Sequence, residues 1–232
     1  MIIGVLKEKL DNETRVAINP AMVKSYIKFG FDVYIESDAG LKSQIEDKDY
    51  TESGAKIVQI DELLSKSNIL LSVNPPSKDD INKIKEGTLL ISFIQTTKEI
   101  EVVKSLKDKK INAISMHLIP RTTLAQKMDA LSSQTNIAGY KAVLIGASHI
   151  DKYMPLLMTA AGTISPAKVL VLGAGVAGLS AIATAKRLGA QVEASDVRPE
   201  VKEQVESLGA KFLEVESDSD DGVGEGGYAK ET

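Results

Sequence analysis

The segment that most constrains the fold runs from Lys168 to Asp196 and reads KVLVLGAGVAGLSAIATAKRLGAQVEASD. The apolar run Val169–Leu172 predicts a buried strand, and Val176–Leu188 predicts a helix directly after a glycine-rich turn. Gln191–Ser195 then predicts a second strand, which Asp196 closes. A strand, turn, helix and strand of these lengths form one βαβ unit, so the sequence predicts a parallel sheet.

The three glycines of this turn have separate tasks. Gly173 permits the tight change of direction, Gly175 lets the backbone approach a pyrophosphate, and Gly178 lets the helix pack close to the strand. The helix that starts at Val176 offers N–H groups and a positive dipole end to phosphates. The pattern therefore predicts a dinucleotide site. The alternative is an apolar βαβ unit with incidental glycines, because a glycine pattern by itself is common.

The acidic residue at the end of the second strand indicates which dinucleotide is preferred. Asp196 follows Gly178 by 18 residues and is placed to accept hydrogen bonds from the adenosine ribose hydroxyls. Its charge would repel a 2′-phosphate, which favours NAD(H) over NADP(H). Arg198, two residues later, weakens this preference and joins the candidate cofactor-binding residues.

Strands alternate with helices along the first half of the chain. Apolar runs predict strands at Ile2–Leu6, Phe31–Ile35, Ile69–Val73, Leu89–Phe93 and Ile111–Ser115. Helix-like segments lie at Pro20–Phe29, Asp61–Ser67, Ser77–Glu86 and Thr97–Asp108. Such alternation is typical of parallel βαβ units. We expect an α/β protein with two parallel-sheet domains, Rossmann-like or flavodoxin-like.

The middle of the chain has another pattern. Thr123 to Ala147 predicts one long helix, with a break at Gly139 as the alternative, and Lys152–Gly162 predicts a second apolar helix. We therefore divide the chain into an N-terminal α/β domain (1–126), interdomain helices (127–165) and a dinucleotide-binding region (166–232).

The last region has room for half of a doubly wound domain, which normally has about six strands. Lys211–Val215 predicts its third strand, and an acidic, glycine-rich stretch follows from Glu214 to Gly227. That stretch predicts a mobile loop or a frayed terminus. With only half of the domain present, the chain is either a fragment or a subunit whose partner supplies the rest.

Composition excludes several classes of function. The 232 residues carry a formal net charge of −4, without the basic stripe of a nucleic-acid binder. The absence of cysteine excludes disulfides, thiolate metal sites and cysteine nucleophiles. No apolar stretch approaches the length of a transmembrane helix. We expect a soluble intracellular protein that can still sit on a membrane partner.

Several long blocks resemble the superfamily of alanine dehydrogenases and proton-translocating transhydrogenases. They include IIGVLKEKLDNETRVAINP at the start, PRTTLAQKMDALSSQTNIAGYKAV in the middle, the glycine-turn block and the late GGYAKE. The second, third and fourth blocks resemble the transhydrogenase component that binds NAD(H). The resemblance implies hydride transfer from NADH to NADP⁺, with NADP(H) held by a partner domain. It also implies membrane-spanning partner components, a homodimer, and a peripheral position on the cytoplasmic or mitochondrial-matrix side.

Two positions separate the branches of this superfamily. Alanine dehydrogenases have a substrate-binding lysine where this chain has Asn74, and a catalytic histidine where it has Gln95. Oxidising an amine releases a proton and so needs a positioned acid or base. Hydride transfer between two nicotinamides needs only positioning and exclusion of water. Both replacements favour a transhydrogenase. An alanine dehydrogenase-like enzyme and a truncated, non-catalytic subunit stay as alternatives.

The resemblance also carries over residues near the nicotinamide. Arg121, Gln126 and Asp129 match an R-x-x-x-x-Q-x-x-D loop, in which we expect Arg121 and Asp129 to interact and Gln126 to reach the second nucleotide. Ser132 is expected beside the nicotinamide, and Tyr228 in GGYAKE matches the tyrosine of a closing loop.

Other polar residues are interpreted as structural. Arg15 matches the position that holds a substrate carboxylate in alanine dehydrogenases, but Asn74 and Gln95 make a retained structural role the better interpretation. For His117 and His149, the sequence favours structural positions over catalytic ones. Two histidines with no converging carboxylates predict no metal site.

Overall fold

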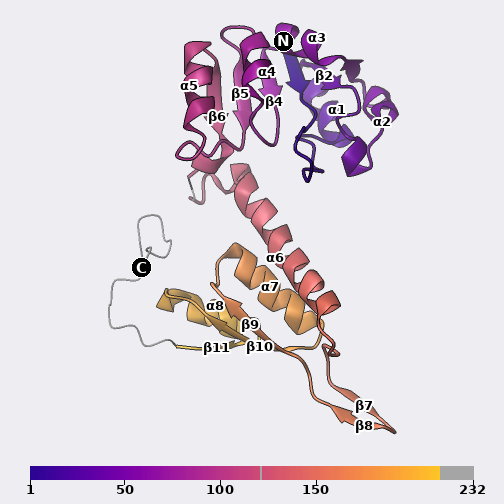
Figure 1. Cartoon of the computed structure of the whole chain (residues 1–232), viewed down its shortest axis with the longest axis vertical. Coiled ribbons are helices and arrows are strands. Elements are labelled where there is room, and N and C mark those ends of the chain that lie inside the picture. The colour runs from indigo at the N-terminus through magenta and orange to yellow at the C-terminus, as the bar shows by residue number, and fades with distance from the viewer. Residues whose placement is uncertain (121, 215–232) are drawn as a thin grey trace. The chain divides into compact units, whose positions relative to one another are not determined.

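The computed structural model describes residues 1–120 and 122–214, which belong to two compact units. The first unit is Met1–Pro120 and the second begins at Arg121. Each unit has its own sheet and its own buried core, so each is described by itself (Figure 1).

The first unit is built on a six-stranded, fully parallel sheet. Its strands are β1 (Ile2–Val5), β2 (Asp32–Glu36), β3 (Lys56–Val58), β4 (Ile69–Leu71), β5 (Leu89–Ser92) and β6 (Asn112–Ser115). They lie in the order β3-β2-β1-β4-β5-β6, which is the strand order of a doubly wound dinucleotide-binding fold. The chain therefore reverses its winding between β1 and β4, and the ends of these two strands meet at one edge.

Helices cover both faces of this sheet. They are α1 (Pro20–Lys28), α2 (Asp47–Glu52), α3 (Ile60–Lys66), α4 (Lys78–Lys83) and α5 (Ile100–Asp108). The predicted start at Pro20 is confirmed: the Asn19 side chain caps α1 by accepting a hydrogen bond from the Met22 N–H at 3.0 Å. The predicted strands and helices of this half are confirmed within a few residues, whereas α2 and β3 lack a prediction.

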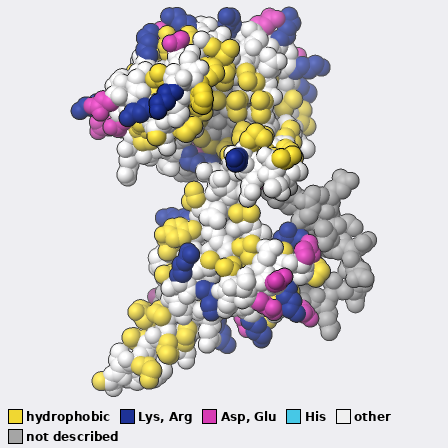
Figure 2. All heavy atoms as spheres, turned by 180° about the vertical axis from the view of Figure 1, so that it is seen from behind, with side chains coloured by type: hydrophobic (Ala, Val, Ile, Leu, Met, Phe, Trp, Pro, Cys, Tyr) yellow, Lys and Arg dark blue, Asp and Glu magenta, His cyan; other side chains and the backbone are white. Residues whose placement is uncertain are grey.

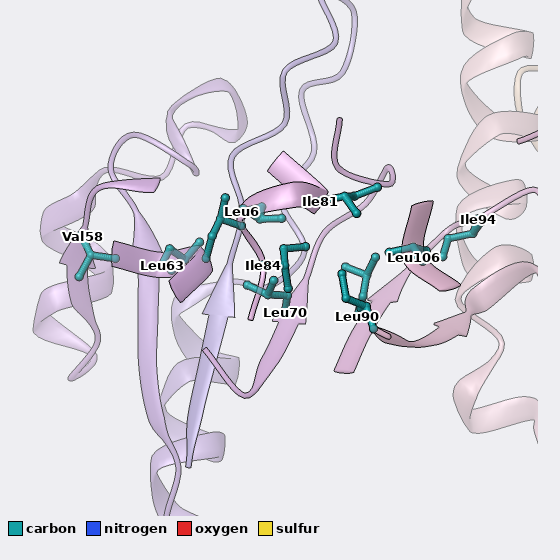
Figure 3. Packing of buried hydrophobic residues seen from close by; sticks show 11 residues of the cluster. Leu6, Val58, Leu63, Leu70, Ile81, Ile84, Leu90, Ile94 and Leu106 are labelled. Atoms are coloured by element: carbon teal, nitrogen blue, oxygen red, sulfur yellow. The ribbon is translucent and has the colours of Figure 1, made fainter. Parts of the chain in front are cut away.

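Two buried clusters fill the faces of the first sheet. One face holds Leu63 and Leu64 of α3, Ile81 of α4 and Leu106 of α5 against Leu70 and Leu90 of the sheet (Figure 3). The other face holds Val23 of α1 and Tyr50 of α2 against Val5, Val33 and Ile35. Neighbouring residues of one strand thus serve opposite faces, as expected for a parallel sheet covered on both sides.

The second unit contains the segment with the glycine turn. Strands β9 (Lys168–Leu172), β10 (Gln191–Ser195) and β11 (Lys211–Phe212) form a parallel sheet in the order β11-β10-β9. Helix α7 (Val176–Arg187) connects β9 to β10, and α8 (Lys202–Ser207), which lacks a prediction, leads to β11. The predicted α/β class with two parallel sheets is confirmed.

The long predicted helix is present as α6 (Ala130–His149), which packs against α7. The predicted start at Thr123 is wrong, because the chain first makes a short 3-10 turn at Gln126–Met128. The alternative break at Gly139 is also wrong. Gly139 is buried, and a Cβ there would overlap the backbone of Ala177, so the glycine brings two helices close together.

The predicted second apolar helix at Lys152–Gly162 is wrong. This region forms an antiparallel hairpin, β7 (Leu157–Thr159) and β8 (Gly162–Ile164), and Gly162 has a φ of +117°. Threonines flank the turn on both strands, and the β-branched threonine and isoleucine of β8 favour a strand. The hairpin carries exposed apolar side chains, among them Leu156, Met158 and Ile164 (lower left in Figure 2).

One face of β9 is uncovered in the described residues of the second unit. Val169 and Val171 pack into the core beneath α7, while the alternate residues Leu170 and Leu172 are 57% and 78% exposed. No helix within the described ranges is both long and apolar enough to cross a membrane.

Candidate functional site

The glycine turn that follows β9 adopts the backbone geometry that the sequence predicts. Gly173 has a φ of +90°, a conformation that residues with a Cβ rarely adopt, and its N–H donates to the Ser195 carbonyl at 2.8 Å. This bond joins the ends of β9 and β10. Ala174 is buried directly after it, so the turn is held firmly between the sheet and α7.

Gly178 has a steric reason to be glycine within the protein itself. A Cβ at this position would overlap the carbonyl oxygen of Gly173, so no side chain fits between the first turn of α7 and the end of β9. The close approach of helix and turn that the motif predicts is therefore present in the described chain.

Gly175 differs, because its surroundings among the described residues are open. The nearest atom to an added Cβ would be Nη2 of Arg198, at 3.9 Å, an ordinary van der Waals distance. Gly175 is the N-cap of α7, and no described side chain caps the helix at this end. Val176 follows as the first helical residue and is 38% exposed. The open space and the uncapped helix N-terminus fit a pyrophosphate group.

Asp196 lies directly beside this turn and accepts hydrogen bonds on both carboxylate oxygens. Its Oδ2 accepts from the Ala174 N–H at 2.6 Å and from Arg198 Nη2 at 3.0 Å. Its Oδ1 accepts from the backbone N–H and from Nε of Arg198, both at 2.9 Å. The Asp196 side chain is only 5% exposed and that of Arg198 is 22% exposed. The structure thus brings the glycine turn, Asp196 and Arg198 into one group.

The two charges of this pair shift each other's proton affinity. Burial opposes ionisation of Asp196, but the hydrogen bonds from Arg198 and Ala174 outweigh it and lower the pKa of Asp196 below its usual value. The carboxylate in turn raises the pKa of Arg198. Asp196 is therefore a carboxylate at neutral pH and can act only as an acceptor toward a ligand.

A second group lies at the N-terminus of α6. Asp129 is the N-cap of this helix: Oδ1 accepts from the Ser132 N–H at 2.8 Å, and Oδ2 accepts from the Ser132 hydroxyl at 2.5 Å. Gln126 lies just before, in the 3-10 turn, with an exposed side chain. The expected partner Arg121 and the candidate Tyr228 both lie outside the described residues.

Helices α6 and α7 connect the two groups through close contact. The Ser180 hydroxyl of α7 donates to the Asn136 carbonyl of α6 at 2.8 Å, and Gly139 meets Ala177 near the start of α7. The helix that Asp129 caps is therefore packed directly on the helix that starts at the glycine turn. The second unit thus holds both groups on one framework of helices.

The two positions that distinguish the dehydrogenase branch lie at the carboxyl edge of the first sheet. Asn74 follows β4, and its Nδ2 donates to Oε2 of Glu8 and to Oε2 of Glu13, each at 3.0 Å. Glu13 in turn accepts from Arg15, at 2.8 Å from Nε and at 2.6 Å from Nη2. Gln95, which follows β5, is exposed. A neutral amide thus bridges two carboxylates, one of which holds Arg15.

This network keeps Glu13 ionised. The hydrogen bond from Arg15 lowers the pKa of Glu13 to about 2, with a further contribution from Asn74 and against the opposing effect of burial. Glu8 is also fixed, since Oε1 accepts from the Val73 N–H at 2.6 Å. Sequence analysis did not single out Glu8 or Glu13. Their spacing from Arg15 in EKLDNETR gives no sign that both contact Asn74, which lies more than 60 residues away.

The two histidines have local partners. The His117 ring lies edge-on to the Phe93 ring, with centroids 5.4 Å apart. Nδ1 of His149 is 2.8 Å from the Ile145 carbonyl oxygen at the end of α6. Among the described residues, no group of three or more histidine, aspartate or glutamate side chains is arranged to hold a metal ion.

Comparisons with known proteins agree with this arrangement. The chain is 50% identical to the NAD(P) transhydrogenase subunit alpha of Haemophilus influenzae over 99% of the chain and 44% of that protein. It is 46% identical to the first of the separate chains of subunit alpha in Rhodospirillum rubrum, covering all of the chain and 62% of that protein. An alanine dehydrogenase of Methanococcus maripaludis is 33% identical over 85% of the chain and 53% of that protein. The chain thus spans about half to three fifths of the length of these relatives.

Solved structures give the same ranking. The transhydrogenase of Sinorhizobium meliloti superimposes with a TM-score of 0.90 at 44% identity, over 92% of this chain and 64% of that one. An L-alanine dehydrogenase superimposes with a TM-score of 0.81 at 28% identity, over 92% of this chain and 60% of that one.

Family models match both units. The model described as alanine dehydrogenase/PNT, N-terminal domain, matches residues 4–138, and the corresponding C-terminal domain model matches residues 142–226. Since the first model alone matches more than half of the 232 residues, the chain belongs to the alanine dehydrogenase/PNT family.

Proposed function

We propose that this chain is the NAD(H)-binding component of a proton-translocating NAD(P) transhydrogenase. The observation that carries the proposal is the combination of the open glycine turn with Asp196 in the second unit and the neutral amide at Asn74 in the first. The turn fits a dinucleotide, and Asn74 and Gln95 replace the groups that an amino-acid dehydrogenase uses. The transhydrogenase relatives, more similar than the dehydrogenases, support the same choice.

In the proposed reaction the C4 hydride of NADH, with its electron pair, passes to C4 of NADP⁺, giving NAD⁺ and NADPH. No proton is gained or lost at either nicotinamide, so no acid or base is required. The chain's own task is to bind NADH and orient it while water is excluded. The N-terminus of α7 and Gly173–Gly175 would hold the pyrophosphate, and Asp196 would accept hydrogen bonds from the adenosine ribose.

The nicotinamide end belongs in this proposal to the group at the start of α6. Asp129 and Ser132 hold each other across the first turn, which fixes the beginning of the helix. Gln126 is exposed just before it and is the residue that we propose reaches the second nucleotide. Arg121 and Tyr228 complete the proposed set by resemblance alone.

The partners follow from the same proposal. NADP(H) is held by a separate component, which docks at Gln126, and membrane-spanning components couple hydride transfer to proton movement. The chain itself acts as a homodimer on the cytoplasmic or mitochondrial-matrix side. The names of the relatives support a multi-component enzyme, because they denote subunit alpha or one of the chains into which that subunit is divided.

Reconstitution tests this function. The full chain is mixed with the NADP(H)-binding component of a transhydrogenase, and NADPH formation from NADH and NADP⁺ is followed. We expect transfer with the wild type, and a rate reduced by roughly tenfold to a hundredfold in Gln126→Ala, because small misplacements of reacting groups cost about this much. The neighbouring exposed residue gives the matched control, Lys127→Ala, for which we expect an unchanged rate.

Two results would overturn the proposal. Oxidation of alanine by the chain with NAD⁺ would place it with the dehydrogenases, despite Asn74 and Gln95. Binding of NADH without transfer in the reconstituted mixture would leave a non-catalytic nucleotide-binding subunit.

A further inference from the structure

The contact between Asp196 and Arg198 bears on which dinucleotide the turn accepts. Two parallel hydrogen bonds, from Nε to Oδ1 at 2.9 Å and from Nη2 to Oδ2 at 3.0 Å, make the pair bidentate. Bidentate guanidinium–carboxylate pairs are among the strongest charge-assisted contacts in proteins. Because the carboxylate is almost fully buried, solvent screens this pair less than an exposed one.

The guanidinium also lies next to the turn itself. Its Nη2 would be the nearest atom to a Cβ on Gly175, the residue at which the backbone is open to a ligand. The carboxylate is at the same time fixed to the turn by the Ala174 N–H. A cation and an anion therefore stand together where an adenosine ribose would lie, and their net charge is zero.

We propose that Arg198 is a specificity-determining residue of this turn, and that the Asp196–Arg198 pair, rather than Asp196 alone, sets the discrimination between NADH and NADPH. The inference rests on the proposed function, since it requires a dinucleotide at the turn. A carboxylate alone repels a 2′-phosphate, but a carboxylate neutralised by a guanidinium repels it weakly. Arg198 also occupies acceptor positions on Asp196 that a ribose hydroxyl would use.

The two members of the pair therefore have opposite effects on specificity. Without the guanidinium, Asp196 keeps the hydrogen bond from Ala174 but presents an uncompensated charge, which disfavours NADPH and leaves acceptors for ribose hydroxyls. Without the carboxylate charge, the guanidinium remains beside the turn as a cation that a 2′-phosphate can contact. A pair with a purely structural role would weaken both nucleotides by the same factor when broken.

The test is a titration of the full chain with NADH and with NADPH, and the measured quantity is the ratio of the two dissociation constants, NADPH over NADH. We expect Arg198→Ala to raise this ratio about tenfold and Asp196→Asn to lower it about tenfold, the usual scale for one charge-assisted contact. Arg198→Lys retains the cation without the two parallel bonds, so its ratio should lie between those of wild type and Arg198→Ala.

Lys202→Ala is the matched control, because it removes a cation four residues further on that pairs with Glu214 at 2.6 Å. Its ratio should equal that of the wild type. A chain that binds NADH but keeps the same ratio in Arg198→Ala, within about twofold, overturns this inference and leaves the proposed function intact. A chain that binds neither nucleotide overturns both.

Discussion

At the scale of single residues, Asn74 shows how one substitution changes the chemistry of an inherited site. Its amide joins two carboxylates, and one of them, Glu13, engages Arg15 through side-chain hydrogen bonds. A substrate carboxylate would have to compete with Glu13 for that guanidinium. The replacement of the lysine by Asn74 was visible in the sequence. Its consequence was not, because the contacts that carry it join residues more than 60 positions apart.

The Glu13 network predicts a specific dependence of stability on acid. The folded-state pKa of Glu13 is about 2, against an ordinary value of 4.5. A depressed carboxyl pKa contributes stability that is present above the ordinary value and lost as the pH falls toward the folded value. Between about pH 4.5 and 2, the free energy of unfolding of the wild type should therefore fall more steeply than that of Glu13→Gln. Urea unfolding of both proteins at a series of pH values measures this difference.

The partner of Glu13 provides the control. In Arg15→Gln the cause of the depressed pKa is removed, so adding Glu13→Gln to that variant should no longer change the acid dependence. Parallel curves for wild type and Glu13→Gln throughout this range would show that the pair does not stabilise the fold.

At the scale of elements, the sequence predicted what periodicity and turn residues encode. The order of strands, glycine turn and α7 followed from apolar runs and glycines, and the structure agrees with them. The hairpin β7–β8 was predicted as a helix, because the apolar residues around Met158 carry no period that separates a strand from a helix. The decisive feature is the left-handed backbone of Gly162, and a glycine alone does not reveal its conformation.

Gly139 illustrates the same limit in the opposite direction. A glycine inside a helical pattern suggested a break, but tertiary contact explains it, because Ala177 of α7 fills the space where a side chain would be. The contact between two helices is not encoded in the local sequence of either one.

The contact between α6 and α7 leads to a prediction about stability. Gly139→Ala places a methyl group against the backbone of Ala177 and should lower the free energy of unfolding by about 1–3 kcal/mol, the usual cost of overpacking. Gly146→Ala in the same helix meets open space and should stabilise by about 0.5–1 kcal/mol, because alanine favours a helix over glycine. Urea unfolding followed by circular dichroism compares the two, and equal effects would contradict the close helix contact.

At the scale of the whole molecule, each unit has its own sheet, and the proposed function divides between them. The second unit holds the nucleotide turn with Asp196, and the first holds the edge where Asn74 and Gln95 replace the acid–base chemistry of a dehydrogenase. The sequence predicted both features, since they depend on short motifs. It did not predict that Ala174 and Arg198 hold Asp196, because neither contact follows a motif. The predicted boundaries at 126 and 165 stay predictions.

The most direct test of the central claim is calorimetric titration of the full chain with NADH, for the wild type and for Gly175→Ala. Among the described residues, the nearest neighbour of the added methyl group is Arg198 Nη2 at 3.9 Å, so the stability of the variant should equal that of the wild type. The account predicts saturable binding of NADH by the wild type and its loss in Gly175→Ala, because the methyl group occupies the space left for the pyrophosphate. Equal binding by both proteins, or by neither, would contradict the account.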